Sequence, residues 1–385
     1  MLEPLLEERY SGDPRRAALS YLLRRREEGA PVVGAYCSYA PSELVWALGG
    51  EVAGLCGSSR EPIAAAQRVL PANLCPLIKS SYGFILTATC PFFELSDAVV
   101  AETTCDGKKK MFELIRDRKP FHLLELPHLP DDPDSQALWA GSVRKLKVFL
   151  EQTFGREITD EALEEAIADS NRRRALVLQT LSYAEQDPPC ATWDELTALT
   201  LLGRTVRGKE GEDLLSRALQ GLADRRRRGL FAAPAGAPRV LVTGCPVQGD
   251  AAKVFRLIEQ AGGVIVAQEA CTGIKPLAMP VEEGTGDPLA ALARRYLQIP
   301  CSVMTPNPGR LALLDDLVAR YRPHCVIDVV LYGCHTYGVE SHTVGAHVKR
   351  RHGLAFLTLE TDYSANDLGP LRNRIEALVE MVQAG

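Results

Sequence analysis

Hydrophobic positions divide the chain into two stretches in which short apolar runs alternate with segments of helical periodicity. The predicted strands cover residues 32–36, 52–55, 98–101, 240–243, 264–267, 326–331 and 355–359. One helix is expected to begin at Pro41-Ser42-Glu43, and another to cover about residues 107–118. Short strands separated by helical segments are typical of parallel sheets covered by helices.

Between these two stretches the strand signal disappears, and long charged segments with helical periodicity take its place. Thr159 precedes an apolar helical face and is expected to be an N-cap, while AAPAGAP at 232–238 has the composition of a linker. The pattern predicts an α/β protein with two Rossmann-like parallel-sheet domains joined by a helical connector. Its predicted parts are an N-terminal helical lead-in at 1–27, a first α/β domain at 28–141, the helical connector and linker at 142–237, and a second α/β domain at 238–385.

Composition limits where the protein works and what it binds. The chain of 385 residues exceeds what one hydrophobic core usually supports, which agrees with two domains. No apolar run approaches the roughly 20 residues that span a bilayer, and the sequence does not begin with a basic-then-apolar leader, so we predict a cytoplasmic protein. The net charge of −5 predicts no attraction to nucleic acid or to membranes. Short basic runs are interpreted as solvated helix faces; they lie at 24–26, 108–110, 172–174 and 225–228.

Eleven cysteines are many for a reducing compartment, where disulfides are rare. In open parallel sheets, ligands bind beyond the carboxyl ends of the strands. Some cysteines follow predicted strands, others lie in proline-rich loops, and neighbouring glycines or prolines let a bulky group approach the backbone. The metal-ligand candidates are Cys105, Cys245, Cys271 and Cys334 after strands, and Cys75 and Cys301 in loops.

The remaining cysteines are expected to be small buried hydrophobic residues with structural roles. Cys190 in the connector and Cys325 at the start of an apolar strand fit that role well. Cys37, Cys56 and Cys90 stay undecided, with structural roles favoured. Structural zinc sites usually use C-x2-C knuckles, which the sequence lacks. Single thiolates from separated loops favour a cubane iron–sulfur cluster instead.

Four segments resemble the 2-hydroxyacyl-CoA dehydratase and benzoyl-CoA reductase superfamily, and the likeness runs from about residue 30 to the C-terminus. The segments are PSELVWALGG, LCPLIKSSYG, DAVVAETTCDGKKKMFELI and YGCHTYGVESHTVGAHVKRRHGLAFLTLETDYS. The resemblance implies that Cys75, Cys105 and Cys334 hold one 4Fe-4S cubane. The contexts of Cys245, Cys271 and Cys301 resemble the double-cubane branch, in which two cubanes share a bridging sulfide (8Fe-9S) and each takes three protein thiolates.

The function that this resemblance implies is ATP-dependent, low-potential reduction of small molecules by an oxygen-sensitive iron–sulfur oxidoreductase. Electrons would come from a transiently bound activator ATPase, because the chain itself has no G-x-x-x-x-G-K-[ST] phosphate loop. The resemblance also implies a homodimer. Two alternatives remain: a subunit of a 2-hydroxyacyl-CoA dehydratase (a lyase) or benzoyl-CoA reductase with one 4Fe-4S cluster, and a non-catalytic iron–sulfur electron carrier.

Reduction also needs proton donors near the predicted site. His335, Glu360 and Asp362 lie in predicted loops at the same edge of the second sheet as the cysteines, so they are the catalytic candidates. A structural role is an equal alternative for His335. For Glu360 and Asp362, capping or hydrogen bonding within a loop is the favoured alternative.

Overall fold

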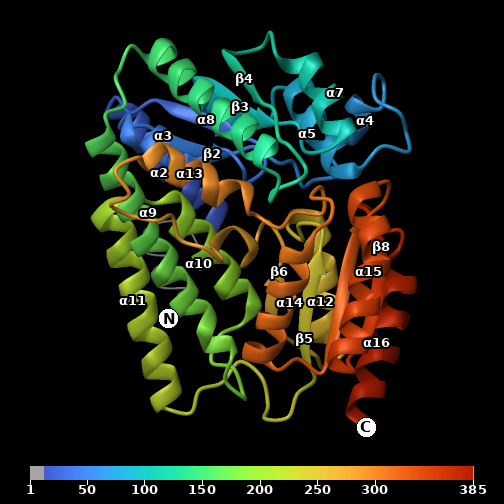
Figure 1. Ribbon diagram of the computed structural model, residues 1–385. Coiled ribbons are helices and arrows are strands. Elements are labelled where there is room, and N and C mark those ends of the chain that lie inside the picture. The colour runs from blue at the N-terminus through green and yellow to red at the C-terminus, as the bar shows by residue number, and fades with distance from the viewer. Residues whose placement is uncertain (1–12, 385) are drawn as a thin grey trace.

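The computed structural model describes residues 13–384 and contains two four-stranded parallel sheets flanked by helices (Figure 1). The strand order is β2-β1-β3-β4 in the first sheet and β6-β5-β7-β8 in the second. The strands are β1 Val32–Ala35, β2 Glu51–Gly54, β3 Ala98–Glu102, β4 Phe121–Leu124, β5 Arg239–Gly244, β6 Val264–Glu269, β7 Cys325–Leu331 and β8 Ala355–Thr361. The two sheets share one topology, and the predicted α/β fold with two Rossmann-like domains is confirmed.

Helices flank both sheets, and the long helices α9, α10 and α11 stand beside the second sheet in Figure 1. In the first half and the connector they are α2 Pro14–Glu27, α3 Ser42–Ala47, α4 Ile63–Ala66, α5 Pro76–Leu86, α6 Pro91–Leu95, α7 Asp106–Ile115, α8 Pro133–Phe154, α9 Asp160–Leu181, α10 Trp193–Thr205 and α11 Gly208–Arg227. In the second half they are α12 Lys253–Gln260, α13 Pro288–Leu297, α14 Pro308–Tyr321, α15 His335–His352 and α16 Leu368–Ala384. None of the helices within residues 13–384 is long and apolar enough to cross a membrane.

Each strand predicted from the apolar runs is present within a few residues of its expected limits. The sequence pattern does not predict β4, because this edge strand has four residues, most of them partly exposed, and no Val or Ile. Thr159 caps α9 as expected, since its side chain accepts a hydrogen bond from the Ala162 amide (3.2 Å). The domain limits stay predictions, and the part of the lead-in before residue 13 lies outside the described residues.

A segment of the second half of the chain packs into the core of the first. Val281, Tyr296 and Cys301 belong to the same buried apolar cluster as Tyr39 and Trp139. Figure 1 shows α13 of this segment beside α3 and α9 rather than against the second sheet. The two halves are therefore joined by shared packing as well as by the connector.

The buried carboxylate of Glu43 ties this crossing segment to the first domain and the connector. Its Oε2 accepts a hydrogen bond from the Tyr296 hydroxyl (2.6 Å) on α13, and its Oε1 accepts one from Ser170 (2.7 Å) on α9. Burial alone would raise the pKa of Glu43, but the nearby Arg174 and Arg295 hold it below its ordinary value. Glu43, in the first turn of α3, thus links α3 to both α9 and α13.

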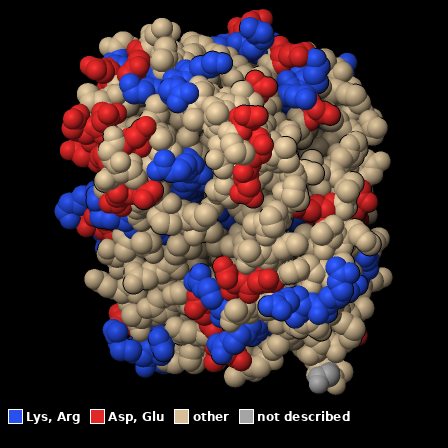
Figure 2. Space-filling view, viewed as in Figure 1, with Lys and Arg blue, Asp and Glu red and all other residues tan. Residues whose placement is uncertain are grey.

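Several cations in the basic runs are buried, so the interpretation of these runs as solvated faces is wrong at those positions. Lys108, Arg173 and Arg174 are buried, whereas Lys109 and Lys110 are exposed. The face seen in Figure 2 interleaves basic and acidic side chains. Runs of like charge in the sequence are thus split between surface and interior by the helical turn.

We predict that Glu43→Ala lowers the free energy of unfolding by about 3–5 kcal/mol, because it leaves Arg174 and Arg295 buried without their counter-ion. Anaerobic urea titrations followed by far-UV circular dichroism measure the change. Glu94→Ala is the matched control, since Glu94 is exposed in the first turn of α6 and is expected to contribute about 0.3–1 kcal/mol through the helix dipole. Equal losses in the two variants would show that the buried carboxylate does not tie the elements together.

Candidate functional site

The carboxyl edge of the second sheet meets the loops beyond the first sheet. The Tyr363 hydroxyl donates to the Gly57 carbonyl (3.3 Å), and the Asp250 amide donates to the Ser58 carbonyl (2.9 Å). Gly333 has φ +69°, and a Cβ there would lie 2.4 Å from the Asn73 carbonyl oxygen, so only glycine fits this approach. Loops from both domains therefore converge at one buried place.

Three of the predicted metal ligands stand at the starts of helices. Cys75, Cys105 and Cys334 are the N-cap residues of α5, α7 and α15. The positive ends of three helix dipoles thus lie beside these residues, which favours thiolates, but the interaction with Cys334 and burial raise the pKa of Cys75, and burial raises that of Cys105. The structure brings Cys75 and Cys105 from the first domain close to Cys334 from the second.

One group of sulfurs consists of Cys75, Cys245 and Cys334. The thiols of Cys245 and Cys75 lie near the sulfur of Cys334, and their interaction with it lowers the pKa of Cys334 well below its ordinary value. Cys245 is also fixed by backbone, because its amide donates to the Val329 carbonyl (2.7 Å) and its sulfur accepts from the Leu331 amide (3.3 Å). This group lies at the carboxyl ends of the paired central strands β5 and β7. From these two strands the chain continues toward opposite edges of the sheet, and ligands usually bind at such a point.

A second group consists of Cys37, Cys271 and Cys301. The Cys37 thiol interacts with the sulfur of Cys271, and this interaction lowers the pKa of Cys271 and raises that of Cys37. Burial raises the pKa of Cys301, although the nearby ammonium of Lys275 acts in the opposite direction. Cys105 interacts electrostatically with both Cys334 and Cys37, and so lies between the two groups.

Cys37 is one of three cysteines that the sequence left undecided, with a structural role favoured. It follows β1 and has φ 65°, a left-handed backbone conformation that is uncommon outside glycine. The Glu102 carboxylate fixes this loop, because it accepts hydrogen bonds from the amides of Tyr39 (3.0 Å) and Ala40 (2.7 Å). Burial raises the pKa of Glu102 to about 7. The rule that ligands follow strand ends would have selected Cys37, had it been applied to β1.

Lys108 is a buried cation beside these sulfurs. Its ammonium faces Cys37, Cys56, the buried carboxylate of Glu102 and Cys105, whose negative charges when ionised raise the pKa of Lys108 against the opposing effect of burial. Within residues 13–384 no hydrogen bond or ion pair to its side chain is found, and its close contacts are the rings of Tyr36 and Phe112 (both 5.9 Å). Glu102 acts on this ammonium only through its charge, and a buried ammonium without an anionic partner in direct contact is costly. A negatively charged group held by the neighbouring thiolates would supply that partner.

A network of buried charges lies beneath the second group of sulfurs. Lys275 pairs with Glu269 (2.8 Å) and donates to the Tyr337 hydroxyl (2.9 Å), while Arg310 contacts the other oxygen of Glu269 (3.2 Å). The pKa of Tyr337 is raised well above its ordinary value, first by burial and then by the charges of Cys301 and Cys271. These side chains are held rigidly next to the cysteines, and the sequence analysis did not select them.

The arrangement of sulfurs differs from that around a single metal ion. A tetrahedral zinc site with Zn–S of about 2.3 Å holds its sulfurs roughly 3.8 Å apart. Within residues 13–384, no three cysteine sulfurs all lie within 4.8 Å of one another, although they interact in pairs. Thiolates that converge on one place but stay spread apart, with a buried cation beside them, fit a polynuclear iron–sulfur cluster. The residues present therefore fit the group that the resemblance implies.

Apart from Cys37, the cysteines that were not predicted as ligands lie away from these groups, with one exception. Cys325 is fully buried in β7, Cys190 lies near the Gln186 side chain (3.5 Å), and Cys90 caps α6 by accepting from the Phe93 amide (3.4 Å). Cys56 is the exception, because its sulfur accepts a hydrogen bond from the Cys37 backbone and it also lies near Lys108. It borders the second group without bridging to the first.

The proposed proton donors occupy different settings. His335 is exposed at the start of α15, and Glu360 is exposed within β8 rather than in a loop. Asp362 accepts a hydrogen bond from the Ser364 amide (2.6 Å) and lies 3.9 Å from Lys253. No hydrogen bond joins any of the three to a cysteine within residues 13–384. Their catalytic roles stay predictions.

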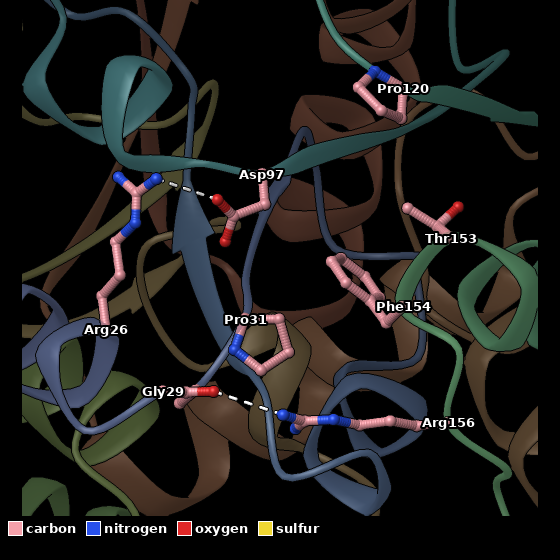
Figure 3. Close-up of a pocket in the computed structure, with 9 residues that line it drawn as sticks. Arg26, Gly29, Pro31, Asp97, Pro120, Thr153, Phe154 and Arg156 are labelled. Carbon is pink, nitrogen blue, oxygen red and sulfur yellow. Dashed lines mark hydrogen bonds and ion pairs between the residues drawn. The ribbon is translucent and has the colours of Figure 1, made fainter.

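A surface hollow of about 450 Å³ lies away from the cysteines, at the opposite edge of the first sheet (Figure 3). Pro31, Asp97 and Pro120 in its wall each directly precede a strand, β1, β3 and β4. Arg26 pairs with Asp97 (3.0 Å) across it. Because ligands in this class of sheet bind at the carboxyl ends, the hollow is not the site.

Two Rossmann-like domains with cysteines at their facing strand ends define the class of protein, an α/β protein that gathers cysteines from both sheets at one junction. Residues 37–382 match the model of the 2-hydroxyglutaryl-CoA dehydratase D-component family. The chain therefore belongs to the 2-hydroxyacyl-CoA dehydratase superfamily, which supports an enzymatic role.

Curated relatives cover nearly the whole chain. The "Putative dehydratase subunit YjiM" of Escherichia coli (strain K12) is 41% identical over 98% of this chain and 98% of its own length. The lactoyl-CoA dehydratase subunit beta of Anaerotignum propionicum is 21% identical over 97% of this chain and 96% of its own length. The (R)-2-hydroxyglutaryl-CoA dehydratase subunit beta of Acidaminococcus fermentans is 20% identical, covering 93% and 94%. The named relatives are thus dehydratase subunits of similar length.

We predict that Cys37→Ser, Cys245→Ser and Cys271→Ser each lower the iron bound by anaerobically purified protein at least twofold, because each removes a thiol from a group of converging sulfurs. Cys190→Ser and Cys325→Ser are the matched controls, and they are expected to keep the wild-type iron content. Iron and acid-labile sulfide assays measure the effect. Equal losses in both classes, or wild-type iron in Cys37→Ser, would contradict the grouping.

Proposed function

We propose that the protein is an iron–sulfur reductase that carries a double-cubane 8Fe-9S cluster and reduces small molecules at low potential. The observation that supports this proposal is the number of converging thiols. Two cubanes with three protein thiolates each need six, and one cubane in this superfamily needs three. Seven cysteines take part in the two interacting groups or lie between them: Cys37, Cys75, Cys105, Cys245, Cys271, Cys301 and Cys334.

In this function the protein would hold the cluster through its cysteines, place charge beside it and keep water away from it. Helix N-termini place positive dipole ends at Cys75, Cys105 and Cys334, Lys108 places positive charge beside Cys105, and Lys275 does so beside Cys301. Burial of Cys245 and Cys301 keeps water away from the sulfurs. When bound, a cluster with three protein thiolates per cubane supplies low-potential electrons and an iron position not held by protein.

The division of the six ligands between the two cubanes remains part of the proposal. The predicted set included Cys75, Cys105 and Cys334 for one cubane and Cys245, Cys271 and Cys301 for the other. The interactions between neighbouring thiols favour a different division, with Cys245 joining Cys75 and Cys334, and Cys37 joining Cys271 and Cys301. In this division Cys105 lies between the two cubanes, beside Lys108.

A second candidate function is a dehydratase subunit with one 4Fe-4S cluster that acts on a CoA thioester. The relatives named as dehydratase beta subunits favour it. In that case only one of the two sulfur groups would hold iron, and the other would contain free thiols. A non-catalytic electron carrier would hold the same iron as either enzyme but would have no substrate of its own.

We predict about eight irons per chain in protein purified without oxygen, because both sulfur groups would be filled. Colorimetric iron and sulfide assays, normalised to amino-acid analysis, measure the content. About four irons per chain, with the thiols of one group still open to alkylation, would favour the single-cubane dehydratase subunit. Stoichiometric zinc without iron would contradict both candidates.

We predict that catalytic reduction requires a separate activator ATPase, since the chain has no phosphate loop and a thiolate-rich cluster has a low potential. The assay measures acetylene reduction under anaerobic conditions with a chemical reductant, with and without the superfamily's iron–sulfur activator and ATP. Turnover is expected to be lost with a non-hydrolysable nucleotide, and the complex is expected to be transient, because the activator must dissociate to be recharged. Full turnover from the reductant alone would contradict ATP gating.

A further inference from the structure

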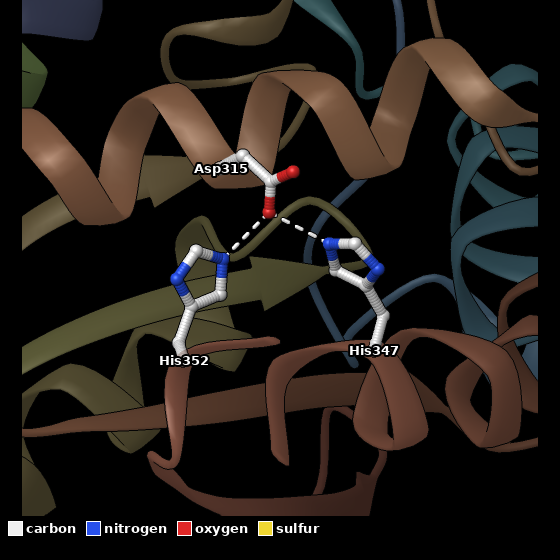
Figure 4. A group of neighbouring side chains, drawn as sticks. All are labelled: Asp315, His347 and His352. Atoms are coloured by element: carbon white, nitrogen blue, oxygen red, sulfur yellow. Dashed lines mark hydrogen bonds and ion pairs between the residues drawn. The ribbon is translucent and has the colours of Figure 1, made fainter. Parts of the chain in front are cut away.

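Two histidines and an aspartate converge on the outer face of the second domain. Oδ1 of Asp315 on α14 lies 2.6 Å from Nε2 of His347 and 2.6 Å from Nε2 of His352, both contributed by α15 (Figure 4). The three ligand atoms all lie within 4.8 Å of one another. The two rings are 5.9 Å apart at 72°, so neither stacks on the other and both nitrogens face the carboxylate.

This cluster is separate from the cysteines. Helix α15 begins at its N-cap, Cys334, and ends at His352, so the cluster lies near the far end of the same helix, roughly 25 Å away along its axis. Its side chains are partly exposed, at 34% for Asp315, 22% for His347 and 17% for His352. Solvent can therefore reach it, while the packing of α14 against α15 holds the three groups in place.

We infer that Asp315, His347 and His352 form a binding site for a divalent transition-metal ion, with zinc as the ion that fits best. Two imidazole nitrogens and one carboxylate oxygen are a common protein donor set for zinc, and water from the exposed side completes a tetrahedron. Zinc bonds of about 2.0–2.2 Å to nitrogen and oxygen require the ligand atoms to stand roughly 3.4 Å apart. Small rotations of the two rings away from Asp315 produce that spacing.

The electrostatic surroundings of this site set a moderate affinity. Asp315 stays ionised, because the imidazoles of His347 and His352 hold its pKa below the ordinary value although burial acts in the opposite direction. His352 is in the last turn of α15, where the negative end of the helix dipole attracts a cation. Lys349, Arg350 and Arg351 in the same turn oppose it, but they are exposed and screened.

A bound ion would act as a staple between two helices. It would fix the end of α15 to α14 on the outside of the second sheet, and its binding free energy would add to the stability of that domain. This inference does not depend on the cluster at the domain junction, because the two sites share no ligand.

The test uses the intact, anaerobically purified protein with its iron in place. Zinc at buffered free concentrations from about 0.1 to 100 µM is equilibrated with the protein, bound zinc is counted by elemental analysis, and its ligands are identified by zinc X-ray absorption. About one additional zinc per chain, with nitrogen and oxygen ligands and no sulfur, is expected at micromolar concentrations. The melting temperature is expected to rise when zinc binds.

His347→Gln, His352→Gln and Asp315→Asn are each expected to weaken zinc binding at least tenfold and to remove the increase in melting temperature. His342→Gln is the matched control, because His342 is an exposed histidine on the same helix outside the cluster. Its zinc binding is expected to equal that of the wild type. Sulfur ligands in the absorption spectrum, equal zinc binding in all variants, or no binding up to 100 µM would overturn the inference.

Discussion

The meeting of two sheet edges is the constraint on which the rest of the structure depends. Each sheet is open and parallel, and each presents the carboxyl ends of its strands to the loops of the other. This places thiols, helix N-termini and buried ammonium groups in one poorly solvated volume, where charges interact strongly and must balance. The buried Lys108 has the Glu102 carboxylate and several cysteines around it but no direct ion pair within residues 13–384. The glycine at Gly333 and the loop held by Glu102 are adjustments that let the edges come this close.

Much of this arrangement could be predicted from the sequence, because it follows from local pattern. Apolar runs predicted all strands but β4, and the rule that ligands follow strand ends selected Cys245 and Cys334, whose sulfurs interact with each other. The failures come from tertiary context. Cys37 has no glycine or proline neighbour that would mark its turn in the sequence. Its left-handed backbone lies in a loop that hydrogen-bonds to Glu102 of β3, a contact that the sequence does not predict.

The burial of charged side chains was the property least predictable from the sequence. Lys108 begins a run of three lysines, and the sequence does not tell which of them the helix turns inward. The same holds for Arg173 and Arg174, whose burial depends on partners far along the chain, such as Glu43. Short strands with mixed exposure, such as β4, are missed for a related reason, since their stability comes from pairing with β3 rather than from their own residues. The local sequence pattern therefore predicted most of the strands and most of the converging cysteines. The buried charged groups beside those cysteines could be identified only from the folded structure.

The crossing of residues 281–304 into the first core has a consequence for how this protein can be divided. A cut in the linker near residue 235 would leave the N-terminal fragment without α13, and so with an exposed apolar face where Tyr296 and Val281 now pack. The C-terminal fragment would carry that segment without a surface to cover it. The two halves have the same sheet topology, yet neither could be moved into another protein as an independently folding unit. Any recombination between members of this superfamily would have to exchange α13 together with the helices α3, α8 and α9 that receive it.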